Sequence, residues 1–276
     1  MKRTTTLIGT ILLILLLETF GLVYVAKIIE HYIFSPLGLT QYILYQWSYK
    51  LIAFVSALIV ANYLRIKLHF KLPKRDHTSQ VMWIVPLLIT ASITIIKIII
   101  SRHDMIAVLK NAVMAVTVGM AEDTFAWGIV LSLLLSFFSK KTTRYRNVYA
   151  LLIASGLFAS MHLMNLFHQD LLGTMIQIIY TFGLGSLLGM TYICSGSLII
   201  PILIHAMWDF PLIFNDLGQH STITLQQAIP FGIMILFISG CLVVYSTFWL
   251  APNNVAYELE QDRKPIQLLN RMGLTY

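Results

Sequence analysis

Residues 119–130 read GMAEDTFAWGIV and place two adjacent carboxylates, Glu122 and Asp123, inside a long apolar run. Removing one carboxylate from water is costly, and two neighbouring ones in an apolar segment need a compensating environment. The run covers about residues 105–138 and is long enough to cross a bilayer as a helix. The stretch therefore predicts a membrane helix that carries a polar, functional site.

The composition of the whole chain is that of a membrane protein. Hydrophobic residues make up 58% of the 276 residues and charged residues 11%, whereas soluble domains carry about 25% charged residues. Apolar stretches of about 18 or more residues recur, each long enough for a transmembrane helix. We therefore predict an all-α fold, a polytopic membrane bundle of about eight transmembrane helices.

Most of the eight expected spans have the length of a single transmembrane helix, but not all of them do. They cover about residues 7–29, 42–64, 81–101, 105–138, 147–166, 172–193, 197–214 and 226–250. The fourth is too long for one perpendicular crossing, so we expect it to tilt, to break or to begin as an interfacial helix. We interpret the first as a retained span because its apolar region is longer than that of a usual signal peptide. Gly185 and Gly189 form a G-x-x-x-G pair in the sixth, which predicts close helix packing.

The basic residues indicate topology rather than a nucleic-acid partner. The net charge is +7, with 19 Lys and Arg against 12 Asp and Glu, and the basic residues cluster between apolar segments. With eight spans these clusters fall on one side of the bilayer. The positive-inside rule then predicts a multi-pass protein of the cell membrane with both termini in the cytoplasm. Cys194 and Cys241 lie in or beside apolar segments, where we expect them to act as small hydrophobic residues.

Three polar clusters lie deep in separate spans. They are Glu122-Asp123, the stretch FASMH that ends at His162, and the stretch HAMWD from His205 to Asp209. Helical spacing puts His205 and Asp209 on one face. At a rise of about 1.5 Å per residue, these clusters can converge near the middle of the membrane. By contrast, we expect structural or interfacial roles for single charges in the spans, which are Glu18, Lys27, Lys50, Lys97 and Lys110.

Such a cluster suits three kinds of chemistry. A carboxylate and a histidine can activate a water for peptide-bond hydrolysis while other polar groups stabilise the oxyanion. The same side chains can instead bind a divalent metal that activates the water, although the H-E-x-x-H signature of zinc proteases is absent. A proton relay in a transporter or channel uses the same residue types.

At these clusters the sequence resembles the CPBP family of intramembrane proteases, which includes type II CAAX prenyl endopeptidases and bacteriocin-associated Abi proteins. The family motifs E-E-x-x-x-R, F-x-x-x-H and H-x-x-x-N or H-x-x-x-D correspond, in this order, to EDTFAW at 122–127, FASMH at 158–162 and HAMWD at 205–209. The run GSLLGMTYICSGSLIIPILIHAMWDF before and across the third motif is also similar to the family pattern. Three ordered motifs with that flanking run are far more specific than any one of them.

The resemblance covers about residues 81–214 and divides the chain into three expected regions. Residues 1–80 hold the N-terminal transmembrane helices and a basic cytoplasmic loop. Residues 81–214 form the catalytic core, and residues 215–276 hold the last transmembrane helix and a cytoplasmic tail.

The resemblance also implies roles for the matching residues. Glu122 would be the general base, working with His162 to activate water, with Phe158 in support. His205 and Asp209 would orient or stabilise the developing oxyanion; an ionised Asp209 would repel it, so we expect Asp209 to be protonated or to act through His205. The family implies a glutamate mechanism without a resident cofactor, and a divalent metal stays open as the alternative.

Two positions depart from the family motif. Asp123 stands where the family has a second glutamate, and Trp127 stands where it has an arginine. Positions 123 and 127 are i and i+4, but Trp127 offers only an indole N–H. We therefore expect Asp123 to find another partner, to reach water or to be protonated. Because adjacent helical residues point about 100° apart, we expect Glu122 to face the shared site and Asp123 to face a neighbouring helix.

The leading functional hypothesis is an intramembrane endopeptidase that cleaves a peptide or membrane-protein substrate within the lipid bilayer. The alternative is a catalytically impaired relative that acts as a bacteriocin-immunity or partner-binding membrane protein, an interpretation favoured by Trp127 in place of arginine. A transporter or channel component is the third hypothesis. No feature of the sequence points to nucleic acid.

Overall fold

The apolar runs of the sequence form helices in the computed structural model, which describes residues 9, 21–29, 31–32, 36, 42–71, 77–101, 105–138, 143–167, 169–216 and 225–250. Within these ranges the regular structure is helical, with no strand. The α-helices are α2 (Leu22–Ile29), α3 (Tyr42–Tyr63), α4 (His77–Ser101), α5 (Met105–Asp123), α6 (Ser132–Phe137), α7 (Thr143–Met161), α8 (Leu171–Ser195), α9 (Ile199–Asp216) and α10 (Leu225–Leu250). A π-helical segment, η3 (Thr124–Leu131), joins α5 to α6, and a 3₁₀ segment, η4 (His162–Phe167), follows α7.

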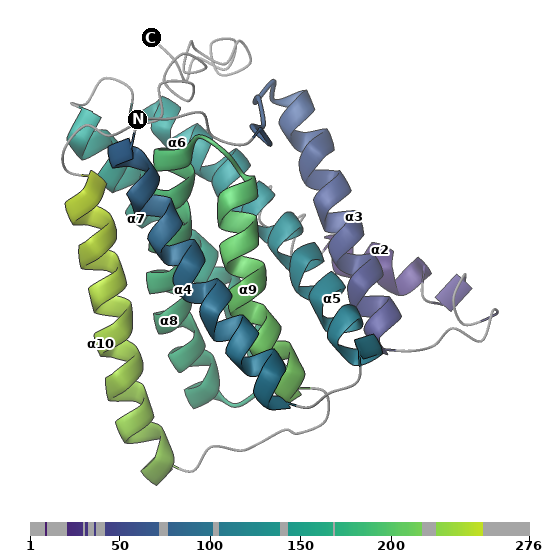
Figure 1. Ribbon diagram of the computed structural model, residues 1–276. Coiled ribbons are helices and arrows are strands. Elements are labelled where there is room, and N and C mark those ends of the chain that lie inside the picture. The colour runs from purple at the N-terminus through teal and green to yellow at the C-terminus, as the bar shows by residue number, and fades with distance from the viewer. Residues whose placement is uncertain are drawn as a thin grey trace.

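The long helices lie side by side in one bundle, with α10 at one edge and α3 at the other (Figure 1). Helix α8 packs against α7 and α10, and α9 packs against α4 and α5. Helix α3 packs against α5 and η3, and the short α2 packs on α3. The interior therefore lies where α5 and η3 meet α7, α8 and α9.

The prediction of an all-α membrane bundle is confirmed. Four helical segments are long and apolar enough to cross a bilayer: Gln80–Ile100, Met105–Phe137, Arg146–Phe167 and Leu171–Ser195. Three shorter apolar helices cover Trp47–Tyr63, Ile199–Ile213 and Gly232–Phe248. Most of the expected first span, 7–29, lies outside the described residues. The outward faces of α4 and α10 expose large apolar side chains, as lipid-facing helices do.

The fourth expected span is one continuous helical run, Met105–Phe137. Instead of breaking, it changes from α-helix to π-helix at Thr124, directly after the two carboxylates, and returns to α-helix at Ser132. Every residue of η3 is buried. Because π segments inside α-helices are rare and concentrate at functional sites, this irregular turn marks the region beside Glu122 and Asp123.

Gly119 lets α5 approach α9 closely. A Cβ atom built on Gly119 would lie 2.9 Å from the backbone oxygen of Ile202 in α9. Any larger side chain at this position would therefore push α5 and α9 apart. Gly119 precedes Asp123 by one helical turn, so this close approach also sets the separation between Asp123 and α9.

Helix α9 carries a proline, Pro211, two residues after Asp209. Pro211 has no N–H, so the carbonyl of Met207, four residues earlier, loses its helical partner. The Thr94 hydroxyl of α4 donates a hydrogen bond of 2.6 Å to that Met207 oxygen. The bond satisfies the orphaned carbonyl and holds α4 against the part of α9 that lies between His205 and Asp209.

Candidate active site

Asp123 lies at the end of α5 and is fully buried, with none of its surface exposed. Its Oδ1 atom accepts a hydrogen bond of 2.8 Å from the indole Nε1–H of Trp127 and lies 3.1 Å from Nδ1 of His205 in α9. The other oxygen, Oδ2, is buried and has no hydrogen-bond partner among the residues that the structure describes. A single carboxylate oxygen therefore joins the π-helical segment to α9.

Trp127 occupies the arginine position of the motif and still supplies a donor to Asp123. Its indole is buried against α8, where Cβ atoms built on Gly185 and Gly189 would lie 3.3 Å and 3.1 Å from ring atoms. The predicted close packing of this glycine pair is confirmed, and the packing includes the space that the tryptophan ring occupies. The pair thus helps to aim the indole N–H at Asp123.

His205 has carboxylates on both sides of its ring. Nδ1 faces Asp123, while Nε2 lies 3.4 Å from Oδ2 of Asp209 and 4.0 Å from Oε2 of Glu122. The predicted i, i+4 placement of His205 and Asp209 on one helix face is confirmed by this contact. A doubly protonated imidazole donates at both nitrogens, and the surrounding oxygens suit that form.

Asp123 faces a neighbouring helix, α9, as expected, and this contact also makes it part of the shared site. Its partner there is His205, which also approaches Glu122. The two adjacent carboxylates therefore converge on opposite nitrogens of one imidazole. The close packing of α5 on α9 at Gly119 brings His205 within reach of both.

Glu122 has a partner that the sequence motifs did not reveal. Lys50 of α3 donates a hydrogen bond of 2.5 Å from Nζ to Oε1 of Glu122, and both side chains are about one fifth exposed. The sequence predicts a structural or interfacial role for Lys50 as an isolated charge, whereas the structure pairs it with Glu122. Its depth, well inside the span expected at 42–64, was the one signal in the sequence that could have identified it.

His162 begins the 3₁₀ segment η4 at the end of α7. Its Nδ1 lies 3.2 Å from the backbone oxygen of Phe158, which suits the tautomer that donates from Nδ1 and leaves Nε2 as an acceptor. The Phe158 ring meets the His162 ring edge-on at 5.4 Å and the His205 ring at 5.9 Å. The Phe158 ring thus contacts both histidine rings.

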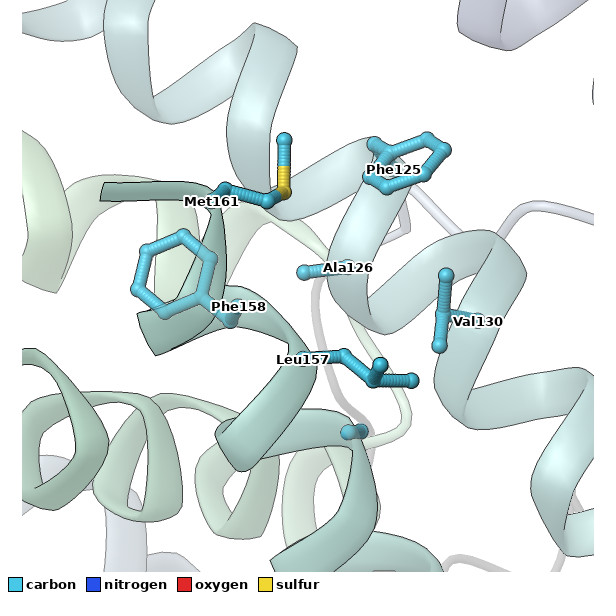
Figure 2. Close-up of a pocket in the computed structure, with 7 residues that line it drawn as sticks. Phe125, Ala126, Val130, Leu157, Phe158 and Met161 are labelled. Carbon is cyan, nitrogen blue, oxygen red and sulfur yellow. The ribbon is translucent and has the colours of Figure 1, made fainter. Parts of the chain in front are cut away.

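An apolar hollow lies beside this cluster, between η3 and α7. It is a shallow depression without enclosed room for a water molecule, and it is lined by Phe125, Ala126, Val130, Ala154, Leu157, Phe158 and Met161. Figure 2 shows Phe125 and Val130 on one wall, with Leu157 and Met161 on the other. The hollow offers only apolar contacts, so the polar chemistry is confined to the adjoining carboxylate and histidine cluster.

The cluster does not have the arrangement of a preformed metal site. No group of three or more His, Cys, Asp or Glu side chains in the described part of the chain is placed to hold a metal ion. His205 has carboxylates at both nitrogens, an arrangement of hydrogen bonds and ion pairs rather than of ligands around a common centre. The donors present therefore do not fit a resident divalent metal as they stand.

Comparison with known protein families gives a match that covers this site. Residues 104–211 match the family described as type II CAAX prenyl endopeptidase Rce1-like. Comparison with curated proteins and with solved structures gives no match. The matched segment begins before α5 and ends in α9, so it contains Glu122, His162 and His205. This segment of the chain is therefore similar to the CAAX-type membrane proteases, in agreement with the resemblance of the sequence motifs.

Proposed function

We propose that this protein is an intramembrane endopeptidase in which Glu122 activates a water molecule to cleave a peptide bond in a membrane-associated protein or peptide. The observation that carries the proposal is the convergence of Glu122, Asp123 and Asp209 on His205, inside the segment that matches the CAAX protease family. Buried charges in membrane helices are expensive, and a site of this composition is suited to acid–base chemistry.

In the proposed reaction, Oε2 of Glu122 takes a proton from water as the water oxygen attacks the carbonyl carbon of the substrate. His162 holds the water through its Nε2 acceptor, which the contact of Nδ1 with the Phe158 carbonyl leaves available. The carbonyl π bond breaks and its electrons move to oxygen, giving a tetrahedral oxyanion. Collapse of this intermediate breaks the C–N bond, and Glu122 returns its proton to the departing amine.

His205 is the proposed donor to the oxyanion. Asp123 on Nδ1 fixes the orientation of the ring and compensates positive charge, so that Nε2–H points toward the Glu122 and Asp209 side. Asp209 acts through this nitrogen rather than on the oxyanion itself, since a free carboxylate there would oppose the negative charge. This division of roles makes Glu122 the reacting acid and Asp123 a positioning residue.

We also propose that the protein lies in the cell membrane with both termini on the cytoplasmic side, as the distribution of basic residues predicts. Its substrate is then a membrane protein or a peptide that partitions into the bilayer.

Comparing the peptides released by cells that express different variants tests the function. Cells with wild-type protein are compared with cells that express Glu122→Gln or His162→Ala at equal levels, and released peptides are identified by mass spectrometry. We expect a set of peptides that both substitutions remove. An exposed substitution, Cys241→Ser in α10, serves as the control and should leave the set intact.

A peptide set that is unchanged by both substitutions would exclude proteolysis. If a cellular phenotype such as bacteriocin immunity then also survives the substitutions, the partner-binding alternative applies. The contact between Trp127 and Asp123 argues for an intact site, because the residue in the arginine position still provides a donor.

A further inference from the structure

The ion pair between Lys50 and Glu122 joins α3 to the candidate catalytic residue across 72 positions of sequence. Among the residues that the structure describes around His205 and Glu122, Lys50 comes from outside the family-matched segment 104–211. No motif that points to the protease chemistry includes it. Its role therefore needs an explanation of its own.

A simple tether between α3 and α5 does not require this pair. Trp47, one turn before Lys50, already donates a hydrogen bond of 3.0 Å from its indole Nε1 to the Thr117 hydroxyl of α5. The hydroxyl in turn donates to the Val113 backbone oxygen, so the contact is neutral and complete. A buried ion pair adds little stability beyond such a contact because desolvation offsets the Coulomb attraction.

The charge balance of the cluster gives Lys50 a more specific role. Glu122, Asp123 and Asp209 all lie within 4.0 Å of His205, so three carboxylates surround one imidazole. Lys50 brings a second cation to this group, and it contacts Glu122 alone among them. In a low-dielectric membrane interior, the Coulomb attraction between such a cation and the nearest carboxylate is strong, so the cation fixes the position of that carboxylate.

The geometry divides the two oxygens of Glu122 between different tasks. Lys50 binds Oε1, while Oε2 points toward Nε2 of His205 at 4.0 Å. That separation is too long for a direct hydrogen bond and is a distance that a bridging water can span. With Oε1 anchored, the carboxylate cannot rotate freely, and Oε2 stays directed at the place where the reacting water is proposed to lie.

We propose that Lys50 is a positioning residue for the Glu122 base, anchoring Oε1 so that Oε2 faces the reacting water and His205. The inference rests on the proposed function, because it assigns Lys50 to the same hydrolytic site. It adds to that site a residue of α3, a helix at the edge of the bundle (Figure 1). The family motifs contain no counterpart of it.

The test uses the full-length protein in liposomes and a fluorogenic peptide that spans a cleavage site found in the cellular comparison. Lys50→Met keeps the length of the side chain but removes its charge and donors. We expect kcat to fall about 10²-fold, the scale of a misplaced reacting group, with KM unchanged. Lys50→Arg, which restores a cation with N–H donors, should recover most of the lost rate. Lys110→Met, which removes an exposed lysine from α5 itself, should match wild type.

Chemical rescue provides a readout that loss of folding would not produce. Lys50 is about one fifth exposed, so a small amine can reach the space left in Lys50→Ala. Ethylammonium chloride should restore kcat in this variant, because it supplies both the charge and an N–H donor for Oε1. Tetramethylammonium chloride at the same concentration has the charge but no N–H, and it should not restore the rate.

Several outcomes would overturn the inference. Lys50→Met with wild-type kcat, Lys50→Arg as slow as Lys50→Met, or equal rescue by both ammonium salts would each exclude an anchoring role. If Lys50→Met does not yield folded protein, Lys50→Arg and the rescue of Lys50→Ala decide the question. Failure of the proposed function is distinct, because it would appear as wild-type protein and Glu122→Gln releasing the same peptides before any lysine variant is made.

Discussion

Glu122 and Asp123 are neighbours in sequence but occupy two different environments. Asp123 is fully buried, and its Oδ1 is held by Trp127 from its own helical run and by His205 from α9. Glu122 is partly exposed, takes a cation from α3 at one oxygen and directs the other toward a gap of 4.0 Å. One carboxylate is enclosed by fixed partners, and the other keeps an oxygen that a water can reach.

These two environments suit two different roles for adjacent carboxylates. A reacting base must exchange protons with a molecule that enters and leaves, so it needs an accessible oxygen. A positioning acid benefits from the opposite, since enclosure by fixed donors holds the histidine in one orientation.

The largest expected effect is on kcat, and it distinguishes the contributions of the two carboxylates to catalysis. Glu122→Gln removes the proposed base, and we expect kcat to fall by about 10²–10⁴-fold. Asp123→Asn keeps a carbonyl oxygen that can accept from Trp127 and His205, so we expect a loss of only about tenfold, or about 1.4 kcal/mol of barrier. Kinetics of the two variants at equal expression measure the difference. A larger loss for Asp123→Asn would reverse the roles assigned here.

The second effect acts on the distance between α5 and α9. Gly119→Ala places a Cβ atom 2.9 Å from the Ile202 backbone oxygen, so the helices must move apart. We expect a loss of about 1–3 kcal/mol in the free energy of unfolding, as for other overpacked interiors. Thermal unfolding in detergent measures the stability, and the peptide assay measures the accompanying loss of activity.

Gly156→Ala in α7 is the matched control, because a Cβ atom built there would meet nothing within 4 Å. Alanine is the better helix former, so this variant should be as stable as wild type or slightly more stable. Equal destabilisation by both substitutions would show that the close approach at Gly119 has no special importance.

The smallest effect should come from the indole N–H. Trp127→Phe keeps an aromatic ring in the space beside Gly185 and Gly189 but removes the donor to Asp123. We expect the free energy of unfolding to fall by at most about 1–3 kcal/mol, because a buried acceptor on Asp123 is left partly unsatisfied. Activity should fall less than in Glu122→Gln. Stability and kcat measured on the same preparation test this, and no change in either would leave the Trp127 contact without a role.

Much of the fold follows from the sequence. Long apolar runs can satisfy their backbone groups in a membrane only as helices, which is why α3 to α10 lie close to the expected spans. The order of the three motifs also anticipated which helices carry polar residues into one region. These features depend on local composition and spacing, which a sequence displays directly.

Other features depend on contacts between distant segments or on unusual backbone geometry. The pairing of Lys50 with Glu122 depends on how α3 packs against α5, and no local pattern encodes it. The convergence of both carboxylates on His205 likewise depends on the approach of α5 to α9. The sequence of η3 does not indicate its π-helical turns either, because the same residues are equally compatible with an α-helix.

The π-helical segment has a consequence for the angular phase of the whole span. Each residue of an α-helix advances the side-chain direction by about 100°, and π turns fit extra residues into the same axial length. Side chains after η3 are therefore rotated relative to those of an uninterrupted helix. The first part of the run meets α3 and α9, and the last part, α6, meets α7. A single span can thus address different neighbours along its length without bending away from the bundle axis.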